Sequence, residues 1–247
     1  MYNTYMITSV KNEIIKEFKK LKEEKDVLCL DNPKLIEEAI NNGWEVLNVL
    51  KTPNFEKGFI KDEILVSENV LKLFTNTVTS QGVVAFLKYK NKQLKPPNGN
   101  FLILDNVQDP GNVGTLIRSA VGAGFCDVYL INCARVCLDK TVRSTMGALF
   151  KCNVYEVDYS FIDILKQWNK RIYVADMKGE SIYNTTFADN LGLVIGNEGH
   201  GVSKSLRDVS TDLISLPMKG NLESLNAGVS GSIIMYQIMF GGNNVRS

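Results

Sequence analysis

The sequence predicts an α/β protein in which a mainly parallel sheet follows a smaller α/β domain. After residue 100, apolar runs of strand length alternate with helical patterns, and such alternation builds parallel sheets covered by helices. The chain has 247 residues, is 45% hydrophobic and carries a formal net charge of +1. These values indicate a folded globular protein with one large domain or two modest ones. Residues 88–100 combine several lysines with Pro96, Pro97 and Gly99, which indicates a linker. We therefore expect domains at 1–95 and 99–247.

The first domain reads as a small layered α/β unit. KNEIIKEFKKLKEEK, from residue 11, has the apolar spacing of an exposed amphipathic helix. Next come the strand VLCL, a helix at about 33–42, the strand EVLNVL, a short helix at about 67–74 and the strand GVVAFL. The lysines of this domain fit a solvated helix face as well as they fit an RNA-facing surface.

In the second domain, strands and helices alternate in order. The pattern gives FLILD, a helix from about 113, DVYLI, a helix at about 140–149, NVYEV, a helix at about 160–168, RIYVA, LGLVI, DLISL and a long helix from about 224. Ligands of parallel sheets bind in the loops after the carboxyl ends of the strands. Three of these loops have unusual chemistry: DNVQDPGNVGTLIRS, GNEGHGVS and PMKGNLESLNAG. We expect all three to face one crevice.

The first loop leads into a helix with two candidate site residues. One stripe of this helix is apolar and is expected to be buried, with Val113, Leu116, Ile117, Ala120 and Val121. Asn112 stands at the start of the helix, where an N-cap and a site residue are equally plausible. Arg118 projects off the stripe. A solvated side chain is the simpler interpretation, but the guanidinium fork also suits a phosphate or a ribose edge.

The other two loops argue against familiar chemistries. Glu198 lies within the glycine-rich turn and no lysine follows until Lys204, which disfavours a phosphate cradle. Ser224 as an acyl-transfer nucleophile would need a histidine. The only one, His200, has no obvious orienting carboxylate and is expected to be an exposed loop residue. Gly228 and Gly231 cost the last helix about 1 kcal/mol each against alanine, so another backbone or a ligand is expected to approach closely.

Composition and spacing exclude further classes. The five cysteines have no CxxC pair, so we expect reduced core thiols and no metal site: Cys29, Cys126, Cys133, Cys137 and Cys152. The first twenty residues lack an apolar signal segment, and the longest apolar run is far shorter than the roughly twenty residues of a bilayer span. We therefore predict a cytoplasmic protein without membrane insertion. A nucleotide-dependent oxidoreductase is a rival, but DNVQDPGNVG is not the GxGxxG fingerprint.

Together the three loops resemble a known family. N-x-G-x3-R at 112–118, GNEGxG at 196–201 and LPM…ESLN at 216–226 are similar to the three signature motifs of the TrmH-type RNA 2′-O-ribose methyltransferases of the SPOUT class. The order, spacing and strand context of the motifs agree over about 150 residues. The resemblance implies a catalytic domain whose sheet has a deep trefoil knot in its carboxyl-terminal part, with S-adenosylmethionine bound in the knotted loops and no metal.

The resemblance also assigns roles to residues. It implies cofactor binding by Gly196, Leu216, Met218 and Leu225. It implies that the loops and the target ribose are fixed by Asn112, Glu198, Ser224 and Asn226. It places Arg118 at the 2′-hydroxyl. Because a guanidinium with a pKa above about 12 is a poor base, we expect Arg118 to orient the hydroxyl and stabilise the alkoxide.

The first domain is similar to the L30e-like RNA-binding module that precedes the catalytic domain in ribosomal-RNA members of the family. ITSVKNEIIKEFKKL and TSQGVVAFL match its start and its exit strand, whereas KEEKDVLCLDNPKL, with Asp31 and Asn32, departs from it. The transfer-RNA members usually lack this module, so 23S ribosomal RNA is the expected substrate. A transfer-RNA 2′-O-methyltransferase and a non-catalytic RNA-binding relative are the alternatives.

The last helix predicts the oligomeric state. It has more apolar surface than is required to cover one face of a sheet. The apolar residues are Ile234, Met235, Tyr236, Ile238 and Met239. We expect a two-fold homodimer through this helix and the helix after Asp109, as the resemblance also implies.

Overall fold

The computed structural model describes residues 6–75, 80–90, 92–219 and 224–241. The chain divides into two compact units, Met1–Lys90 and Asn91–Ser247. The predicted domain limits, 95 and 99, lie a few residues beyond this division, so the proline-containing segment belongs to the second unit.

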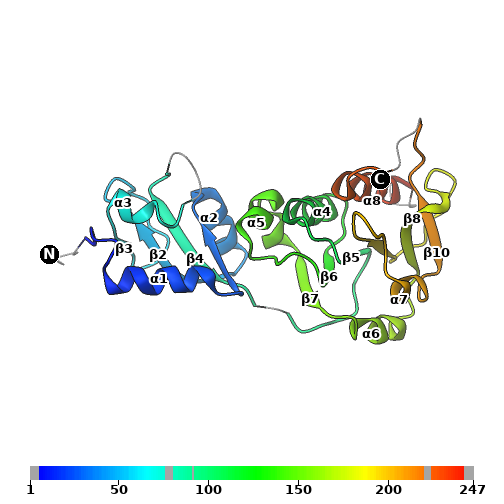
Figure 1. Cartoon of the computed structure of the whole chain (residues 1–247), viewed down its shortest axis with the longest axis horizontal. Helices are drawn as coiled ribbons and strands as arrows, with labels where there is room; N and C mark the ends of the chain where they lie inside the picture. The colour runs from blue at the N-terminus through cyan, green and yellow to red at the C-terminus, as the bar shows by residue number, and fades with distance from the viewer. Residues whose placement is uncertain (1–5, 76–79, 91, 220–223, 242–247) are drawn as a thin grey trace. The chain divides into compact units, whose positions relative to one another are not determined.

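The N-terminal unit is a four-stranded sheet with three helices (Figure 1). The strand order is β1-β4-β2-β3, with β4 antiparallel to β1 and β2, and β3 parallel to β2. Its elements are α1 (Glu13–Glu23), β1 (Val27–Leu30), α2 (Pro33–Asn41), β2 (Glu45–Lys51), β3 (Ile64–Leu65), α3 (Glu68–Leu71) and β4 (Val83–Lys88). Asn32 caps α2 by accepting hydrogen bonds from the backbone N–H groups of Lys34 and Leu35.

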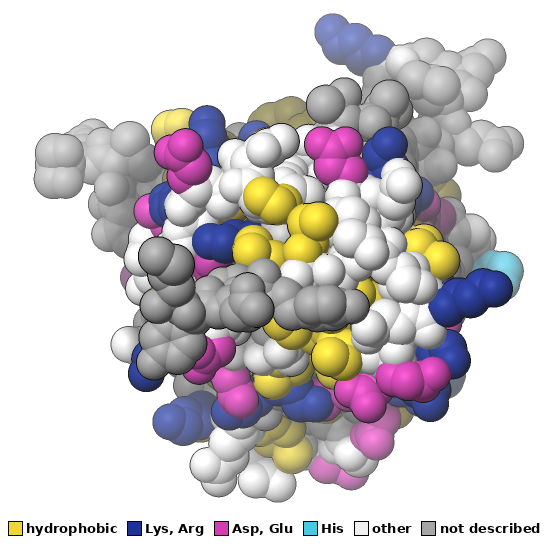
Figure 2. Space-filling model, turned by 90° about the vertical axis from the view of Figure 1, so that its left-hand side faces the viewer, with side chains coloured by type: hydrophobic (Ala, Val, Ile, Leu, Met, Phe, Trp, Pro, Cys, Tyr) yellow, Lys and Arg dark blue, Asp and Glu magenta, His cyan; other side chains and the backbone are white. Residues whose placement is uncertain are grey.

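The core of this unit is mainly aliphatic and contains three phenylalanine rings in contact. Phe18 of α1 stacks on Phe86 of β4 with ring centroids 5.2 Å apart, and Phe74 meets both rings edge-on. On the face shown in Figure 2, basic and acidic side chains are interspersed around a central group of hydrophobic side chains.

The C-terminal unit contains a six-stranded sheet in which every pair of neighbours is parallel. The strand order is β10-β8-β9-β5-β6-β7. Its strands are β5 (Phe101–Asp105), β6 (Asp127–Ile131), β7 (Asn153–Val157), β8 (Ile172–Ser181), β9 (Gly192–Ile195) and β10 (Asp212–Ser215). The predicted α/β fold with a parallel sheet is confirmed. The chain reverses its direction of progress between β5 and β9, which is where ligands of such sheets bind.

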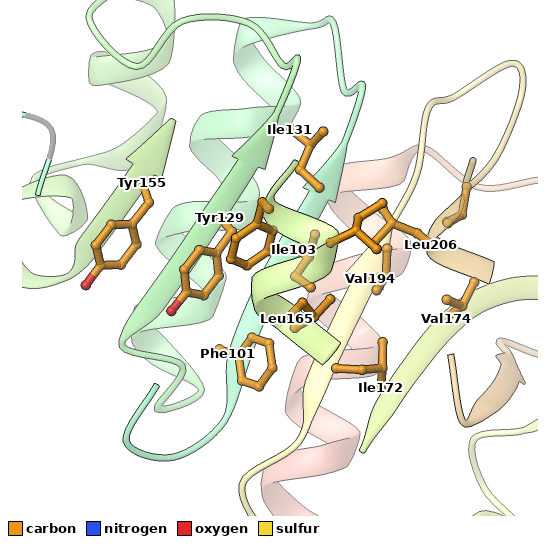
Figure 3. Packing of buried hydrophobic residues seen from close by; sticks show 13 residues of the cluster. Phe101, Ile103, Tyr129, Ile131, Tyr155, Leu165, Ile172, Val174, Val194 and Leu206 are labelled. Carbon is orange, nitrogen blue, oxygen red and sulfur yellow. The ribbon is translucent and has the colours of Figure 1, made fainter. Parts of the chain in front are cut away.

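Helices cover both faces of this sheet (Figure 1). One face carries α4 (Pro110–Gly122), α5 (Asp139–Thr145) and α8 (Ala227–Gly241), and the other carries α6 (Phe161–Gln167) and α7 (Lys204–Arg207). Figure 3 shows Leu165 of α6 pointing at the sheet, beside the rings of Phe101 and Tyr129. Tyr129 stacks on Tyr155 of the next strand with centroids 4.9 Å apart, so aromatic side chains join β5, β6 and β7 under α6.

Two elements differ from the sequence-based expectation. The helix expected at about 140–149 ends at Thr145, because Met146 and Gly147 have φ angles of 48° and 88°; a 3₁₀ turn, Ala148–Lys151, follows. Strand β8 extends well beyond RIYVA and pairs with β10 across a register shift. A Cβ on Gly179 of β8 would lie 2.4 Å from the backbone nitrogen of Ile214, so the close approach of the two strands requires glycine.

Helices α4 and α8 pack closely through small residues. A Cβ on Gly231 would lie 2.4 Å from Cδ2 of Leu116, and the hydroxyls of Ser119 and Ser232 are 2.7 Å apart. The glycines of the last helix predicted a close neighbour, and this neighbour is α4. Gly228 faces the first turn of α4.

Among the helices that the structure describes, none is long and apolar enough to cross a bilayer. No group of three histidine, cysteine or acidic residues suited to hold a metal ion is found within the described ranges.

Candidate functional site

The three loops singled out in the sequence all begin at the carboxyl edge of the C-terminal sheet. They follow β5, β9 and β10, and β5 and β9 are direct neighbours. The position of the loops follows from the parallel arrangement, since every strand of such a sheet ends at the same edge.

A hydrogen-bonded network of side chains connects these loops. The amide Nδ2 of Asn112 donates to Oε1 of Glu198 at 2.8 Å, and Nδ2 of Asn226 donates to Oδ1 of Asn112 at 2.9 Å. Asn226 also accepts a hydrogen bond from the backbone N–H of Val229 in the first turn of α8. Three of the predicted site residues are therefore in direct contact, although they come from distant parts of the chain.

Asn112 is free for this role because another residue caps its helix. Asp109 is the N-cap of α4, and its carboxylate accepts from the backbone N–H of Asn112 at 2.9 Å. The same carboxylate pairs with Lys140 of α5 at 2.7 Å, and these two hydrogen bonds lower the pKa of Asp109. The interpretation of Asn112 as an N-cap is therefore wrong.

The loop after β9 is a tight turn that presents Glu198. Asn197 and Gly201 exchange two backbone hydrogen bonds of 2.9 and 3.0 Å across the turn. The side chain of Asn197 accepts from the N–H groups of Gly199 and His200 and donates to the backbone oxygen of Asn106. A tightly braced turn therefore carries Glu198 and, as expected, leaves His200 exposed. Asn197 was not predicted, although asparagine between two glycines is a turn signal.

Gly196 is needed in this turn because a side chain would not fit there. A Cβ at this position would lie 2.4 Å from the carbonyl carbon of Gly201. Because the obstacle is backbone, it cannot move aside as a flexible side chain could. Gly196 is therefore required for the turn to close, whatever it contacts in a ligand.

A second anchor holds the far end of the turn. The buried carboxylate of Asp105, at the end of β5, accepts from the backbone N–H of Ser203 at 2.6 Å and from the hydroxyl of Tyr159 at 2.8 Å. Burial and the hydrogen bond to Asp105 raise the pKa of Tyr159. Asp105 was not among the predicted site residues. The sequence did carry a signal for it, because an acid ends the apolar run FLILD.

Next to the network lies a cavity of about 120 Å³ between β8, β10 and the start of α8. Its lining includes the predicted site residues Leu216, Met218, Ser224 and Leu225. The rest of its lining was not predicted: Ala175, Asp176, Met177, Ile214, Ser230 and Ile234. Gly196 is not among the lining residues. Residues 220–223, within the third loop, lie outside the described ranges.

Asp176 gives this mainly apolar cavity a carboxylate. Its burial raises the pKa, but hydrogen bonds from the backbone N–H of Lys178 and from Arg207 outweigh burial, so that the pKa is lowered overall. Arg207 also donates to the backbone oxygen of Val202 at 2.9 Å and so ties the turn after β9 to strand β8. Because Arg207 neutralises its charge, Asp176 offers the cavity a hydrogen-bond acceptor for an amino group and no net negative charge.

Arg118 lies apart from the network. It is exposed on α4, six residues after Asn112, which places it about 9 Å further along the axis and about 120° around the helix. Within the described part of the chain, its side chain has no hydrogen bond or ion pair. The structure thus joins Asn112, Glu198 and Asn226 and leaves Arg118 on the outer side of α4.

A parallel sheet with a site at the carboxyl edge of its strands defines an α/β protein that binds its ligand at the switch in strand order. The chain belongs to the SpoU rRNA methylase family, whose model matches residues 99–236. The predicted TrmH type of RNA methyltransferase is thereby confirmed.

Known proteins similar to this chain support the assignment. The 23S rRNA (guanosine(2553)-2′-O)-methyltransferase RlmP of Bacillus subtilis is 31% identical over 254 residues, which cover 94% of this chain and 98% of that protein. The AdoMet-bound rRNA methyltransferase from Sinorhizobium meliloti is 25% identical with a TM-score of 0.84, over 95% of this chain and 97% of that one. A putative RNA methyltransferase of the TrmH family from Porphyromonas gingivalis is 26% identical with a TM-score of 0.80, over 91% and 96% of the two chains.

Proposed function

We propose that this protein transfers the methyl group of S-adenosylmethionine to the 2′-hydroxyl of a ribose in 23S ribosomal RNA. The observation that carries the proposal is the network of Asn112, Glu198 and Asn226 beside a cavity lined by Leu216 and Met218. The name of the B. subtilis relative, which matches along nearly the whole chain, supports ribosomal RNA as the substrate.

The cavity fits part of the cofactor. At about 120 Å³ it has the volume of about four water molecules, enough for one ring system and too little for a whole nucleoside. Its walls are mainly apolar, with the carboxylate of Asp176 at one side, and S-adenosylmethionine has a flat aromatic base with an amino group at its edge and no phosphate. Leu216, Met218 and Leu225 would hold the adenine.

The chemistry supplied by the cofactor is an activated methyl group on sulfur. Glu198 stands at an exposed turn with Asn112 bonded to one of its oxygens, so its carboxylate can accept a hydrogen bond from a ribose hydroxyl. Asn226 fixes Asn112 in turn. Arg118 would stabilise the negative charge that develops on the ribose oxygen. Ser224 lines the cavity and would help to fix the ribose beside it.

Two features of the fold, a knot in the C-terminal unit and an RNA-binding role of the N-terminal unit, are also proposed. We infer that the segments after β9 and β10 form the deep trefoil knot implied by the motifs. The N-terminal unit would be an L30e-like module that binds the RNA, with its free lysines toward the phosphates. With ribosomal RNA as the substrate, the protein would act in the cytoplasm and without a metal.

A homodimer through α4 and α8 is supported by the surface of α8. Four large side chains on one side of this helix are exposed: Val229, Ile233, Tyr236 and Phe240. Their spacing forms a single stripe along α8. Arg118 is exposed on α4 one turn before Gly122, which adjoins Tyr236 of this stripe. A second copy would cover this stripe. Light scattering at micromolar concentration should give a dimer, and a monomer would contradict it.

The function is tested by binding and by product analysis. Calorimetry should detect S-adenosylmethionine binding at micromolar affinity, and tritiated cofactor should label a 23S transcript at one ribose. Ser230→Trp, which fills the cavity, should abolish binding and transfer, whereas Thr186→Trp on an exposed loop should leave both unchanged. A methyl group on a base, or tight NAD binding without S-adenosylmethionine binding, would overturn the proposal.

A further inference from the structure

A second and larger hollow lies at the carboxyl edge of the same sheet and has no part in the proposed cofactor site. It is a groove of about 530 Å³ at the ends of β6 and β7, within the size range of ligand pockets. Its less exposed lining, the floor, is mainly apolar but includes the carboxylate of Glu156, which accepts a hydrogen bond from the backbone N–H of Val136 at 2.9 Å, and its exposed rim is polar. Phe161 and Ile164 of α6 and Leu94 contribute to the floor, and Asn132, Arg135 and Asp158 to the rim.

The groove shares a wall with the first loop of the candidate site. The side chain of Gln108 donates to the backbone oxygen of Asn132 at 2.7 Å, and the thiol of Cys133 accepts from the backbone N–H of Val107 at 3.3 Å. Val107 and Gln108 lead directly into the turn that carries Asn112. The groove therefore adjoins the loop that leads to Asn112, whose side chain contacts Glu198.

The rim carries a cation that the protein does not neutralise. Arg135 is exposed, and its side chain has no ion pair or hydrogen bond to any residue that the structure describes. Its backbone is nevertheless fixed, because its carbonyl oxygen accepts from the hydroxyl of Thr141 at 3.0 Å. By contrast, the neighbouring cations Lys140 and Arg143 are paired with Asp109 and Asp139.

The other rim groups are suited to the edge of a base. Asp158 is held by hydrogen bonds from the hydroxyl and the backbone N–H of Ser160, which lower its pKa and keep it a carboxylate. A carboxylate accepts hydrogen bonds from the amino groups of guanine and cytosine, and the amide of Asn132 can donate or accept. Unpaired RNA bases are recognised in this way, on apolar surfaces with polar groups at their edges.

We propose that this groove binds a single unpaired RNA nucleotide next to the methylated ribose. Its base lies on the apolar floor, and its phosphate is bound by Arg135. The inference rests on the proposed function, since it adds a recognition site to the same RNA-modifying surface. Arg135 would select the substrate without touching the reacting atoms.

The test compares binding and turnover on a 23S transcript. Arg135→Ala should raise the KM for RNA about five- to tenfold with kcat within about twofold. The apparent affinity of the Arg135→Ala variant for RNA should also depend less on salt. The slope of log K against log salt concentration should be smaller in magnitude by about one. Lys170→Ala, which removes a cation at the opposite edge of the sheet, should change neither quantity.

A second variant blocks the groove itself. Ser160→Trp places an indole at the exposed rim and should raise the KM for RNA more than tenfold, with unchanged calorimetric affinity for S-adenosylmethionine. Thr186→Trp is the matched control. If Arg135→Ala and Ser160→Trp both behave like their controls, the groove does not bind RNA.

The two proposals fail in different ways. If the wild-type protein transfers no methyl group to 23S RNA, the proposed function is wrong, and fluorescence anisotropy with the labelled transcript still decides the groove. Weaker RNA binding by Arg135→Ala than by Lys170→Ala supports it. Equal binding overturns it.

Discussion

Replacing Asn112 by alanine tests whether the network that joins the three loops positions the site. The change deletes the hydrogen bond to Glu198 and the one from Asn226, which measure 2.8 and 2.9 Å. A hydrogen bond to a charged group contributes about 1.5–3 kcal/mol and a neutral one about 0.5–1.5 kcal/mol. Both partners are exposed, so water replaces most of each bond. We expect the free energy of unfolding to fall by only about 1 kcal/mol.

The loss of activity should be larger than the loss of stability. A displacement of about 1 Å at a reacting centre can cost a factor of about a hundred, so kcat/KM for RNA should fall about ten- to a hundredfold. Asn112→Asp keeps the volume and the acceptor for Asn226 but places a second carboxylate against Glu198. It should be at least as harmful as alanine, because the missing feature is the donor.

The assay is a double-mutant cycle on kcat/KM with Asn112→Ala, Glu198→Ala and the combined variant. If the two residues act through their hydrogen bond, the combined loss should be smaller than the sum by about 1 kcal/mol or more. Urea unfolding of each variant separates misfolding from mispositioning. Additive losses, or normal turnover in Asn112→Ala, would refute the reasoning.

Three further predictions follow from the surroundings of the site. Gly196→Ala should lower the thermal midpoint by several degrees and weaken S-adenosylmethionine binding in calorimetry, because its Cβ would lie 2.4 Å from the backbone of Gly201. At pH 8 a thiol reagent should modify exposed Cys126 in the native protein and reach Cys133 only after unfolding, because burial raises the pKa of Cys133 to about 12. The fold lowers the pKa of Asp176, so its contribution to stability is complete above the unfolded value of about 3.9 and is lost as the pH falls through the folded value. Urea unfolding should therefore show a difference between wild type and Asp176→Asn that is constant from pH 6 to 8 and shrinks below pH 4.

The strands of the C-terminal sheet could be predicted because they are continuous apolar runs. FLILD, DVYLI and NVYEV coincide with β5, β6 and β7. Because β5 and β6 are buried along their whole length, the residues inside each strand are apolar and only an end carries an acid. Strand β3 has two residues and gives no periodic signal. The second half of β8 is polar, and its pairing with β10 depends on Gly179, whose need for close approach is visible only in three dimensions.

The sequence named the members of the hydrogen-bonded network but could not predict their contacts. The motifs supplied Asn112, Glu198 and Asn226 as separate residues, and no local rule pairs side chains that lie 86 and 114 positions apart. Whether Asn112 caps its helix was open in the sequence, because Asp109 three residues earlier is an equally good cap. Asp176 was missed because an acid after a strand is common, and its link to Arg207 arises only from the fold.

The motif gives Arg118 a role in catalysis, but its position on α4 is apart from the hydrogen-bonded network. In the proposed reaction, negative charge develops on the ribose oxygen, and Arg118 is the only cation among the predicted site residues. Arg118→Ala should therefore lower kcat about a hundredfold or more with cofactor affinity within a few fold, and Arg118→Lys should restore little because it lacks the fork. Yet this side chain lies about 120° around its helix from Asn112 and about 9 Å further along the axis.

In a dimer through α4 and α8, Arg118 would instead lie close to the second copy and would act at the partner's site. Mixed dimers distinguish the two cases. When Arg118→Ala subunits are refolded together with Ser230→Trp subunits, each mixed dimer contains one cavity intact in Ser230 and one intact Arg118 on the opposite subunit. Activity should then return, although both parent dimers are inactive. If Arg118 serves its own subunit, no mixture recovers activity, and the α4–α8 dimer is not the source of the missing cation.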